Sequence, residues 1–169
     1  MLRKALVSSS GPSSHLRPSR VISTLTSTQA ATFATKSATD RLQVGSVLEC
    51  QRDFSADDVS AFVITTGDLN PIHTNRTAAK ASGFSGQVLP GVLCASLFPA
   101  LIGSNFPGAI YLSQTLKFRA PALVGDCVTA RITVEKVSGS RVAFKTECLS
   151  GSGVLLVDGF AMALMPGRQ

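Results

Sequence analysis

A carboxylate and an imidazole lie close together in residues 67–73, which read Gly-Asp-Leu-Asn-Pro-Ile-His. Pro71 restricts the backbone between Asp68 and His73, so both side chains can meet at one water molecule. Such a pair suits the addition of water to an activated double bond, because one group accepts a proton from water while a protonated group donates one to the neighbouring carbon. The spacing alone also fits a simpler alternative, in which Asp68 forms a turn beside a helix end and His73 is a surface or hydrogen-bonding histidine.

A second candidate group is the backbone amide of Gly91, which follows Pro90 at the start of an apolar segment. The first amide groups of a helix have no partner within the helix, so they are free to donate to a docked group. The amide of Gly91 is therefore able to hold a thioester oxygen as that oxygen gains negative charge. An ordinary helix start explains the same residues and stays open at this point.

The candidate pair must be positioned by the elements that flank it. Residues 46–54 predict a strand, after which Ser55 and Asp58 have the spacing of a capping box, with Asp in place of the usual Glu. A helix is expected to begin there and to end near Gly67, because glycine permits a left-handed exit. Beyond the irregular stretch that carries the pair, a short helix is predicted over residues 76–81.

Residues 92–102 are nearly all apolar, too hydrophobic on every side for a surface helix, and predict a buried helix. Pro99 removes one backbone donor from this segment, so we expect a kink or break near Phe98. The C-terminal half alternates apolar and polar residues, which is typical of strands with one buried face. The predicted class is α+β, a single domain with one antiparallel sheet partly wrapped around one central helix. Its C-terminal strands are expected over residues 110–118, 128–135, 141–149 and 154–165.

Charge is unevenly distributed along the chain, whose formal net charge is +6. Residues 1–39 hold five basic side chains, fifteen Ser or Thr and no acid, whereas residues 40–169 hold eleven basic and ten acidic side chains. An acid-free, Arg-bearing, hydroxyl-rich N-terminus is typical of an organelle transit peptide, with a disordered tail as the alternative. We expect a leader over residues 1–39 and one catalytic domain over residues 40–169. The nearly neutral domain does not favour a nucleic-acid partner.

Histidine and cysteine usage argues against a metal site. Removal of the leader would take His15 and leave His73 as the only histidine, which excludes a multi-histidine centre. The four cysteines are isolated from one another, without the paired spacing of a zinc or redox site. We expect neither a metal nor another cofactor. No apolar run approaches the roughly 18 residues that a membrane span requires, so none is expected.

Three motifs together resemble the MaoC-like (R)-specific hydratases. They are the Asp-Leu-Asn-Pro-Ile-His segment at 68–73, the Pro-Gly-Val-Leu segment at 90–93, and Tyr-Leu-Ser-Gln-Thr-Leu-Lys-Phe-Arg-Ala-Pro at 111–121 followed by Val-Gly-Asp at 124–126. The resemblance covers roughly residues 45–166 in the family's order and spacing. It implies a hot-dog fold, usually a homodimer, whose catalytic loop overhangs the central helix.

The same resemblance implies roles for particular residues. Asp68 and His73 would activate the water, and the Gly91 amide would bind the thioester carbonyl. Two positions depart from the family pattern: Pro90 stands where the family often has His, and Pro99 aligns with a serine that some members carry in the central helix. These departures affect the helix geometry and the acyl pocket more than the reaction. The residues expected to bind substrate are Asn70, Ser96, Leu97 and Leu101.

The implied activity is that of a hydro-lyase, which interconverts (R)-3-hydroxyacyl and trans-2-enoyl thioesters. A single such domain behind an organelle leader is similar to the 3-hydroxyacyl-acyl-carrier-protein (ACP) dehydratases of mitochondrial type II fatty acid synthesis. The expected partner is therefore ACP, or a CoA thioester, in the mitochondrial matrix, with the plastid as the alternative compartment. The first alternative function is an (R)-specific enoyl-CoA hydratase of β-oxidation. A hot-dog thioesterase or a non-catalytic acyl-binding subunit fits less well, because both Asp68 and His73 are present.

Overall fold

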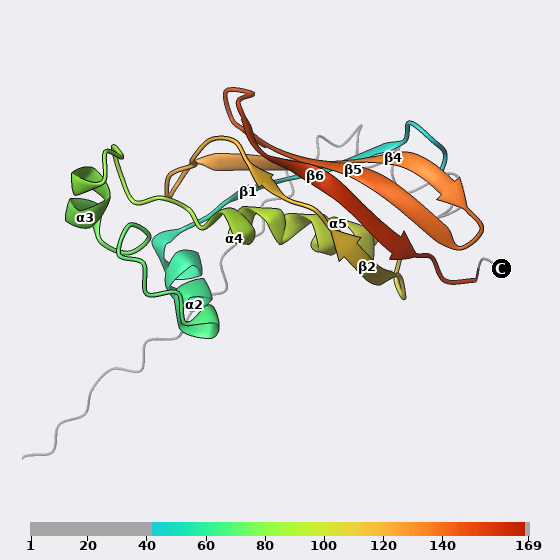
Figure 1. The fold of residues 1–169 in the computed structure, drawn as a ribbon, viewed down its shortest axis with the longest axis horizontal. Coiled ribbons are helices and arrows are strands. Elements are labelled where there is room, and N and C mark those ends of the chain that lie inside the picture. The colour runs from blue at the N-terminus through green and yellow to red at the C-terminus, as the bar shows by residue number, and fades with distance from the viewer. Residues whose placement is uncertain (1–41, 168–169) are drawn as a thin grey trace, which may run out of the picture.

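The computed structural model describes residues 42–167, which form a sheet and four helices (Figure 1). The first strand, β1 (Val47–Asp53), leads directly into helix α2 (Ala56–Thr66). Ser55 accepts a hydrogen bond from the amide of Asp58, and the Asp58 carboxylate accepts one from the amide of Ser55. At the other end, Gly67 adopts a left-handed conformation with φ of 73°. The predicted capping box and glycine exit are therefore both confirmed.

The central helix consists of two segments, α4 (Gly91–Ala95) and α5 (Leu97–Asn105). The predicted break is present, but it lies at Ser96, so its expected position near Phe98 was wrong by two residues. Pro99 explains the shift, because a proline fits in the first turn of a helix, where its missing N–H has no intrahelical partner. Burial is also one-sided: Leu97, Phe98, Leu101 and Ile102 are buried, whereas Val92 is 55% exposed.

The sheet is antiparallel in every pairing, and its main path runs β1-β4-β5-β6-β2. The predicted strand over residues 110–118 is divided in two, because the chain bends at Thr115 and its carbonyl passes directly over Gly159. Thr115 still donates to the Phe160 carbonyl at 2.8 Å, so the bend stays attached to β6. The C-terminal strands are β2 (Ile110–Gln114), β3 (Lys117–Phe118), β4 (Cys127–Ser138), β5 (Arg141–Ser150) and β6 (Leu155–Leu164).

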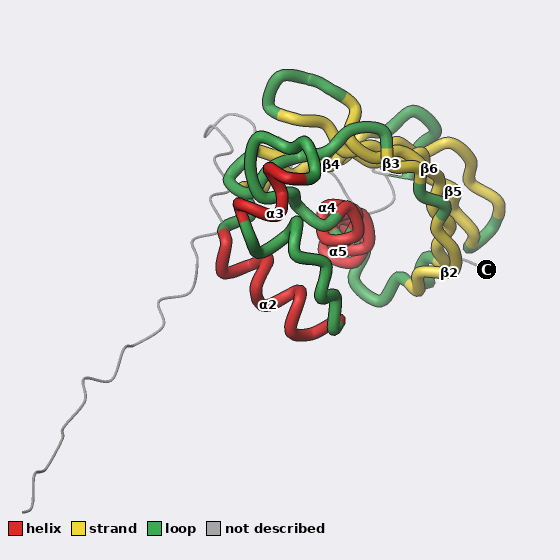
Figure 2. Tube along the Cα trace, turned by 60° about the vertical axis from the view of Figure 1, so that its left-hand side comes forward, coloured by secondary structure: helices red, strands yellow, loops and turns green. Residues whose placement is uncertain are grey.

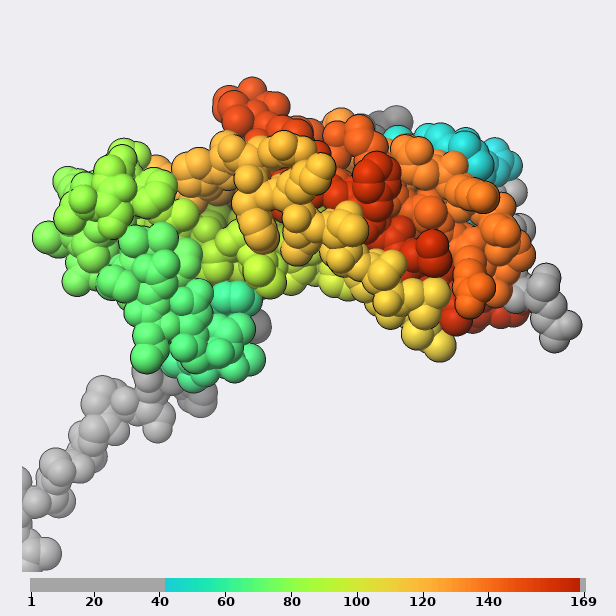
Figure 3. Space-filling view, viewed as in Figure 1, coloured from blue at the N-terminus to red at the C-terminus, as the bar shows by residue number. Residues whose placement is uncertain are grey.

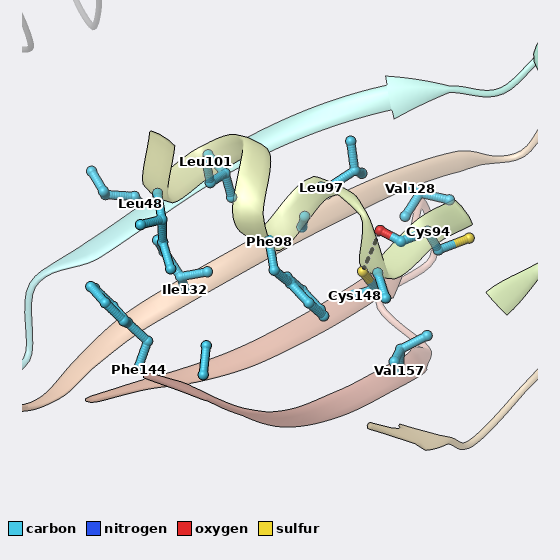
Figure 4. Packing of buried hydrophobic residues seen from close by; sticks show 14 of the residues in the cluster. Leu48, Cys94, Leu97, Phe98, Leu101, Val128, Ile132, Phe144, Cys148 and Val157 are labelled. Carbon is cyan, nitrogen blue, oxygen red and sulfur yellow. Dashed lines mark hydrogen bonds between the residues drawn. The ribbon is translucent and has the colours of Figure 1, made fainter. Parts of the chain in front are cut away.

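The sheet curves around α4 and α5, which lie against its concave face (Figure 2). Phe98 of α5 is fully buried, together with Ile132 of β4 and Phe144 of β5, and these side chains fill the layer between helix and sheet (Figure 4). Burying such large apolar side chains contributes roughly 1.5–3 kcal/mol each, so this layer fixes the helix on the sheet. The α+β hot-dog architecture is confirmed.

Two further expectations concern the ends of the chain and the membrane. The predicted leader over residues 1–39 lies outside the described residues. Within residues 42–167, no helix has the length and hydropathy needed to cross a membrane.

Candidate active site

The loop between α2 and α3 (Arg76–Ala81) carries the candidate pair and is held by its own side chains. Asp68 accepts a hydrogen bond from the Asn70 amide at 3.0 Å, and the Asn70 side-chain oxygen accepts one from the Ile72 amide at 3.3 Å. The His73 amide donates to the Asn70 carbonyl at 3.2 Å. Asp68 is therefore a turn-forming residue as well, but the turn uses only its Oδ1.

His73 is a buried residue with 9% of its surface exposed, so a surface histidine was wrong, whereas the other half of that alternative, a hydrogen-bonding histidine, agrees with the structure. Its Nδ1 lies 2.7 Å from the Val88 carbonyl oxygen. A carbonyl only accepts hydrogen bonds, so Nδ1 must carry the proton and donate it. In the neutral ring, Nε2 is then left with a free lone pair. Nothing in the local sequence signals this partner, because a backbone carbonyl carries no residue-type information.

Asp68 and His73 face each other across a short gap. Asp68 Oδ2 and His73 Nε2 are 3.6 Å apart, farther than a direct hydrogen bond allows. Both atoms are acceptors when Asp68 is ionised and His73 is neutral, so they can receive the two hydrogens of one water molecule. The site therefore combines a buried, oriented imidazole with a carboxylate whose side chain is 37% exposed.

Gly91 lies three residues after Val88, which contacts this loop. Besides its contact with the imidazole, Val88 donates through its amide to the Ile72 carbonyl at 3.0 Å. Gly91 then begins α4, where the amides of Leu93 and Cys94 already bond to the Pro90 carbonyl. The Gly91 amide precedes these helical hydrogen bonds, so it is available to a ligand.

Phe118 packs against Gly91, a contact that the sequence did not reveal. A Cβ atom built on Gly91 would lie 2.5 Å from two ring atoms of Phe118, so only glycine fits there without displacing the ring. Phe118 nevertheless remains 57% exposed. The residue belongs to the 111–121 motif, but no residue-type pattern indicates a contact between β3 and the start of α4.

The four residues expected to bind substrate take different positions. The side-chain oxygen of Asn70 is used by the loop, and the hydroxyl of Ser96 donates to the Leu93 carbonyl at 2.6 Å. Leu97 and Leu101 are buried on α5, with 8% and 6% exposed (Figure 4). The structure thus brings together Asp68 and His73, whereas Leu97 and Leu101 lie in the core along α5.

Comparison with known proteins gives consistent matches across the domain. Residues 39–152 match the MaoC like domain family. The mitochondrial 3-hydroxyacyl-[acyl-carrier-protein] dehydratase FERN of Solanum lycopersicum is 40% identical over 139 residues, which cover 79% of this chain and 84% of that protein. The (R)-specific enoyl-CoA hydratase of Aeromonas caviae is 35% identical over 129 residues, covering 74% and 96%.

Solved structures agree with the sequence matches. The (R)-hydratase from A. caviae superposes with a TM-score of 0.72 at 34% identity and covers 74% of this chain and 98% of that one. The R-hydratase PhaJ1 from Pseudomonas aeruginosa gives 0.70 at 31% identity, with 74% and 83% covered. The extent of these matches leads to one conclusion: the chain belongs to the MaoC-like domain family.

Proposed function

We propose that this protein is an (R)-3-hydroxyacyl-thioester dehydratase, working reversibly as a trans-2-enoyl hydratase. The observation that carries the proposal is the 3.6 Å gap between Asp68 Oδ2 and His73 Nε2, two acceptors that converge on one water position. Asp68 Oδ1 already accepts a hydrogen bond from the Asn70 amide, and His73 Nδ1 already bonds to the Val88 carbonyl. The two atoms that remain, Asp68 Oδ2 and His73 Nε2, are the ones that face the gap.

In the hydration direction, the water oxygen attacks the β-carbon while one of its protons passes to the pair. The pair then returns a proton to the α-carbon, so the net change is the addition of H and OH across the double bond. Charge that develops on the thioester oxygen during this step would be stabilised by the Gly91 amide. Dehydration follows the same path in reverse, because both directions share one transition state.

The carrier of the acyl group is proposed to be ACP. Support comes from the names of two relatives, the 3-hydroxyacyl-[acyl-carrier-protein] dehydratases of Solanum lycopersicum and Arabidopsis thaliana, both called mitochondrial. The (R)-specific enoyl-CoA hydratase of A. caviae supports the CoA alternative.

We place the protein in the mitochondrial matrix, with residues 1–39 as the leader. A fluorescent fusion of residues 1–45 that stayed in the cytosol or entered plastids would contradict this placement.

A homodimer is proposed as the working assembly. The outer side of the central helix leaves Val92 exposed, and the edge strand β2 leaves Ile110 and Leu112 exposed by 60% and 43%. A second copy would cover such apolar surface. The acyl chain would run beside the central helix, near Leu97 and Leu101, where each buried methylene contributes about 0.8 kcal/mol.

The function is tested with purified protein, crotonyl-CoA and crotonyl-ACP, by following the enoyl absorbance and the chirality of the product. Loss of absorbance with formation of the (R)-3-hydroxy product is expected on at least one carrier. Release of a free thiol without hydration would identify a thioesterase and contradict the proposal. A large preference for crotonyl-CoA would favour the alternative carrier.

A further inference from the structure

The stretch that follows Asp68 contains no acidic residue for more than fifty positions. No Asp or Glu occurs between Asp68 and Asp126, whereas this stretch contains Arg76, Lys80, Lys117 and Arg119. Arg119 forms two hydrogen bonds with Asp158, and Lys117 also lies near that carboxylate. Among the ion pairs of residues 42–167, none includes Arg76 or Lys80. The two cations of α3 are therefore the uncompensated charge beside the site.

Helix α3 presents these two cations on one face. Arg76 and Lys80 are four residues apart and both exposed, so they lie side by side on the helix surface. The helix is anchored by Ala79, which is fully buried, and by a hydrogen bond from the Phe84 amide to the Ala79 carbonyl at 3.0 Å. The Asn75 side chain caps the helix by accepting from the amides of Thr77 and Ala78.

Only one of the two charges stabilises α3. Lys80 lies in the last turn, where a cation interacts favourably with the helix dipole. Arg76 is the first helical residue, where a cation is unfavourable, and the first turn contains no acid to offset it. A partner that brings negative charge to this face would compensate Arg76.

The position of α3 suits a partner that delivers substrate. The helix begins three residues after His73. It lies with α2 in a lobe at one end of the molecule (Figure 3), and the start of α4 points toward that end (Figure 1). The β4–β5 turn lies at the opposite end (Figure 1). A protein docked on α3 would therefore stand beside the catalytic loop without covering the rest of the sheet.

We propose that the Arg76–Lys80 face of α3 is the docking surface for an acidic acyl carrier protein. This inference rests on the proposed function, since it names the surface on which the carrier proposed there would dock. The cations would attract the acidic carrier and hold it while its acyl-bearing arm enters the site. Complementary charge of this kind acts mainly on association, so it should appear in KM and in the salt dependence.

The test compares the full-length wild type with Arg76→Glu/Lys80→Glu on crotonyl-ACP, crotonyl-CoA and crotonyl-pantetheine. The matched control is Lys136→Glu/Arg141→Glu, which makes the same charge change near the β4–β5 turn, on two exposed cations that also form none of the described ion pairs. We expect the α3 variant to lower kcat/KM for crotonyl-ACP by roughly tenfold or more through KM, and to weaken its salt dependence. Activity on crotonyl-pantetheine should be unchanged.

The docking proposal would be overturned if the α3 variant left the kinetics on crotonyl-ACP unchanged, or if the control variant had an equal effect. Equal increases in KM for crotonyl-ACP and crotonyl-CoA would also overturn it, because they would indicate recognition of the nucleotide phosphates of CoA. If the Glu variant lost activity on all three substrates, Arg76→Gln/Lys80→Gln would decide by whether its KM rises for ACP alone. A wild type that hydrates none of the substrates would refute the proposed function instead.

Discussion

At the candidate site, the fold holds the two side chains of the proposed catalytic pair to different degrees. His73 is buried and bonded through Nδ1, whereas Asp68 is partly exposed and held by a turn of its own loop. The imidazole therefore has one available orientation, with Nε2 directed at the gap. The carboxylate of Asp68 uses Oδ1 for the turn, which leaves Oδ2 for the proposed chemistry.

Replacing either member of the pair should remove activity and preserve the fold. Asp68→Asn keeps a side-chain oxygen for the Asn70 amide, but it can place a donating NH₂ where Oδ2 accepted from water. His73→Ala removes the other acceptor. We expect each to reduce turnover by about 10²- to 10⁴-fold, the range for a positioned acid or base. Steady-state kinetics measures the loss, and a folded variant with near wild-type turnover would remove that residue from the mechanism.

The contact between Gly91 and Phe118 allows a second test at single residues. Gly91→Ala places a methyl group into the Phe118 ring, so either the ring or the start of α4 must move. We expect kcat to fall, because the amide of residue 91 would leave its position. Phe118→Ala makes room for the methyl group, so the double variant should be more active than the two single effects predict. Additive losses in this kinetic cycle would show that the contact does not position the amide.

At the scale of the elements, local patterns predicted most of the framework. The Ser55–Asp58 box, the exit at Gly67 and the short helix over residues 76–81 all depend on neighbours in sequence, and all are confirmed. The errors lie where tertiary contacts decide. The bend at Thr115 depends on Gly159, far along the chain, and the orientation of His73 depends on a backbone carbonyl. Neither contact produces a periodic signal.

Gly159 should be essential to the bend that separates β2 from β3. A Cβ atom there would lie 1.7 Å from the Thr115 carbonyl oxygen, a backbone atom that cannot rotate away. We expect Gly159→Ala to lower the free energy of unfolding by roughly 1–3 kcal/mol or more, as overpacking does. Gly86→Ala is the control, because its Cβ would meet Leu123 at an ordinary 3.6 Å. Equal urea midpoints for the two variants would contradict this account of the bend.

The capping box should make stability depend on pH. Burial raises the pKa of Asp58, but hydrogen bonds from Ser55 and Arg52 outweigh it and hold the pKa below the ordinary value of 3.8. Because the folded-state pKa is the lower one, the contribution is present above the ordinary value and lost as pH falls through the folded value. Asp58→Asn should thus lower the free energy of unfolding by about 1 kcal/mol at pH 7 and by less at pH 3. Urea unfolding at both pH values measures this loss of stability, with Asp57→Asn, which leaves the box intact, as the control. A loss for Asp58→Asn that was larger at pH 3 than at pH 7 would disprove the pH dependence.

At the scale of the whole molecule, a single chain leaves its apolar surface incompletely covered. The sequence indicated this for the central helix, which is apolar on most sides although one sheet can cover only part of it. The structure adds the edge strand β2, whose outer edge pairs with no strand among residues 42–167. Neighbouring β6 contributes Phe160 and Met162, exposed by 58% and 37%. Exposed edges and apolar patches of this kind are typical of surfaces that bind a second chain.

The proposed dimer should therefore depend on β2. Leu112→Lys places a charge on the exposed edge strand, where pairing with a second copy would bury it without a partner. We expect light scattering to show a dimer for the wild type and a shift toward monomer for Leu112→Lys, with activity on crotonyl thioesters falling in parallel. Val154→Lys is the matched control, because Val154 is also exposed, at 51%, but lies at the β5–β6 turn, away from β2. If the wild type were monomeric and active, or if both variants dissociated equally, the apolar edge of β2 would require another explanation.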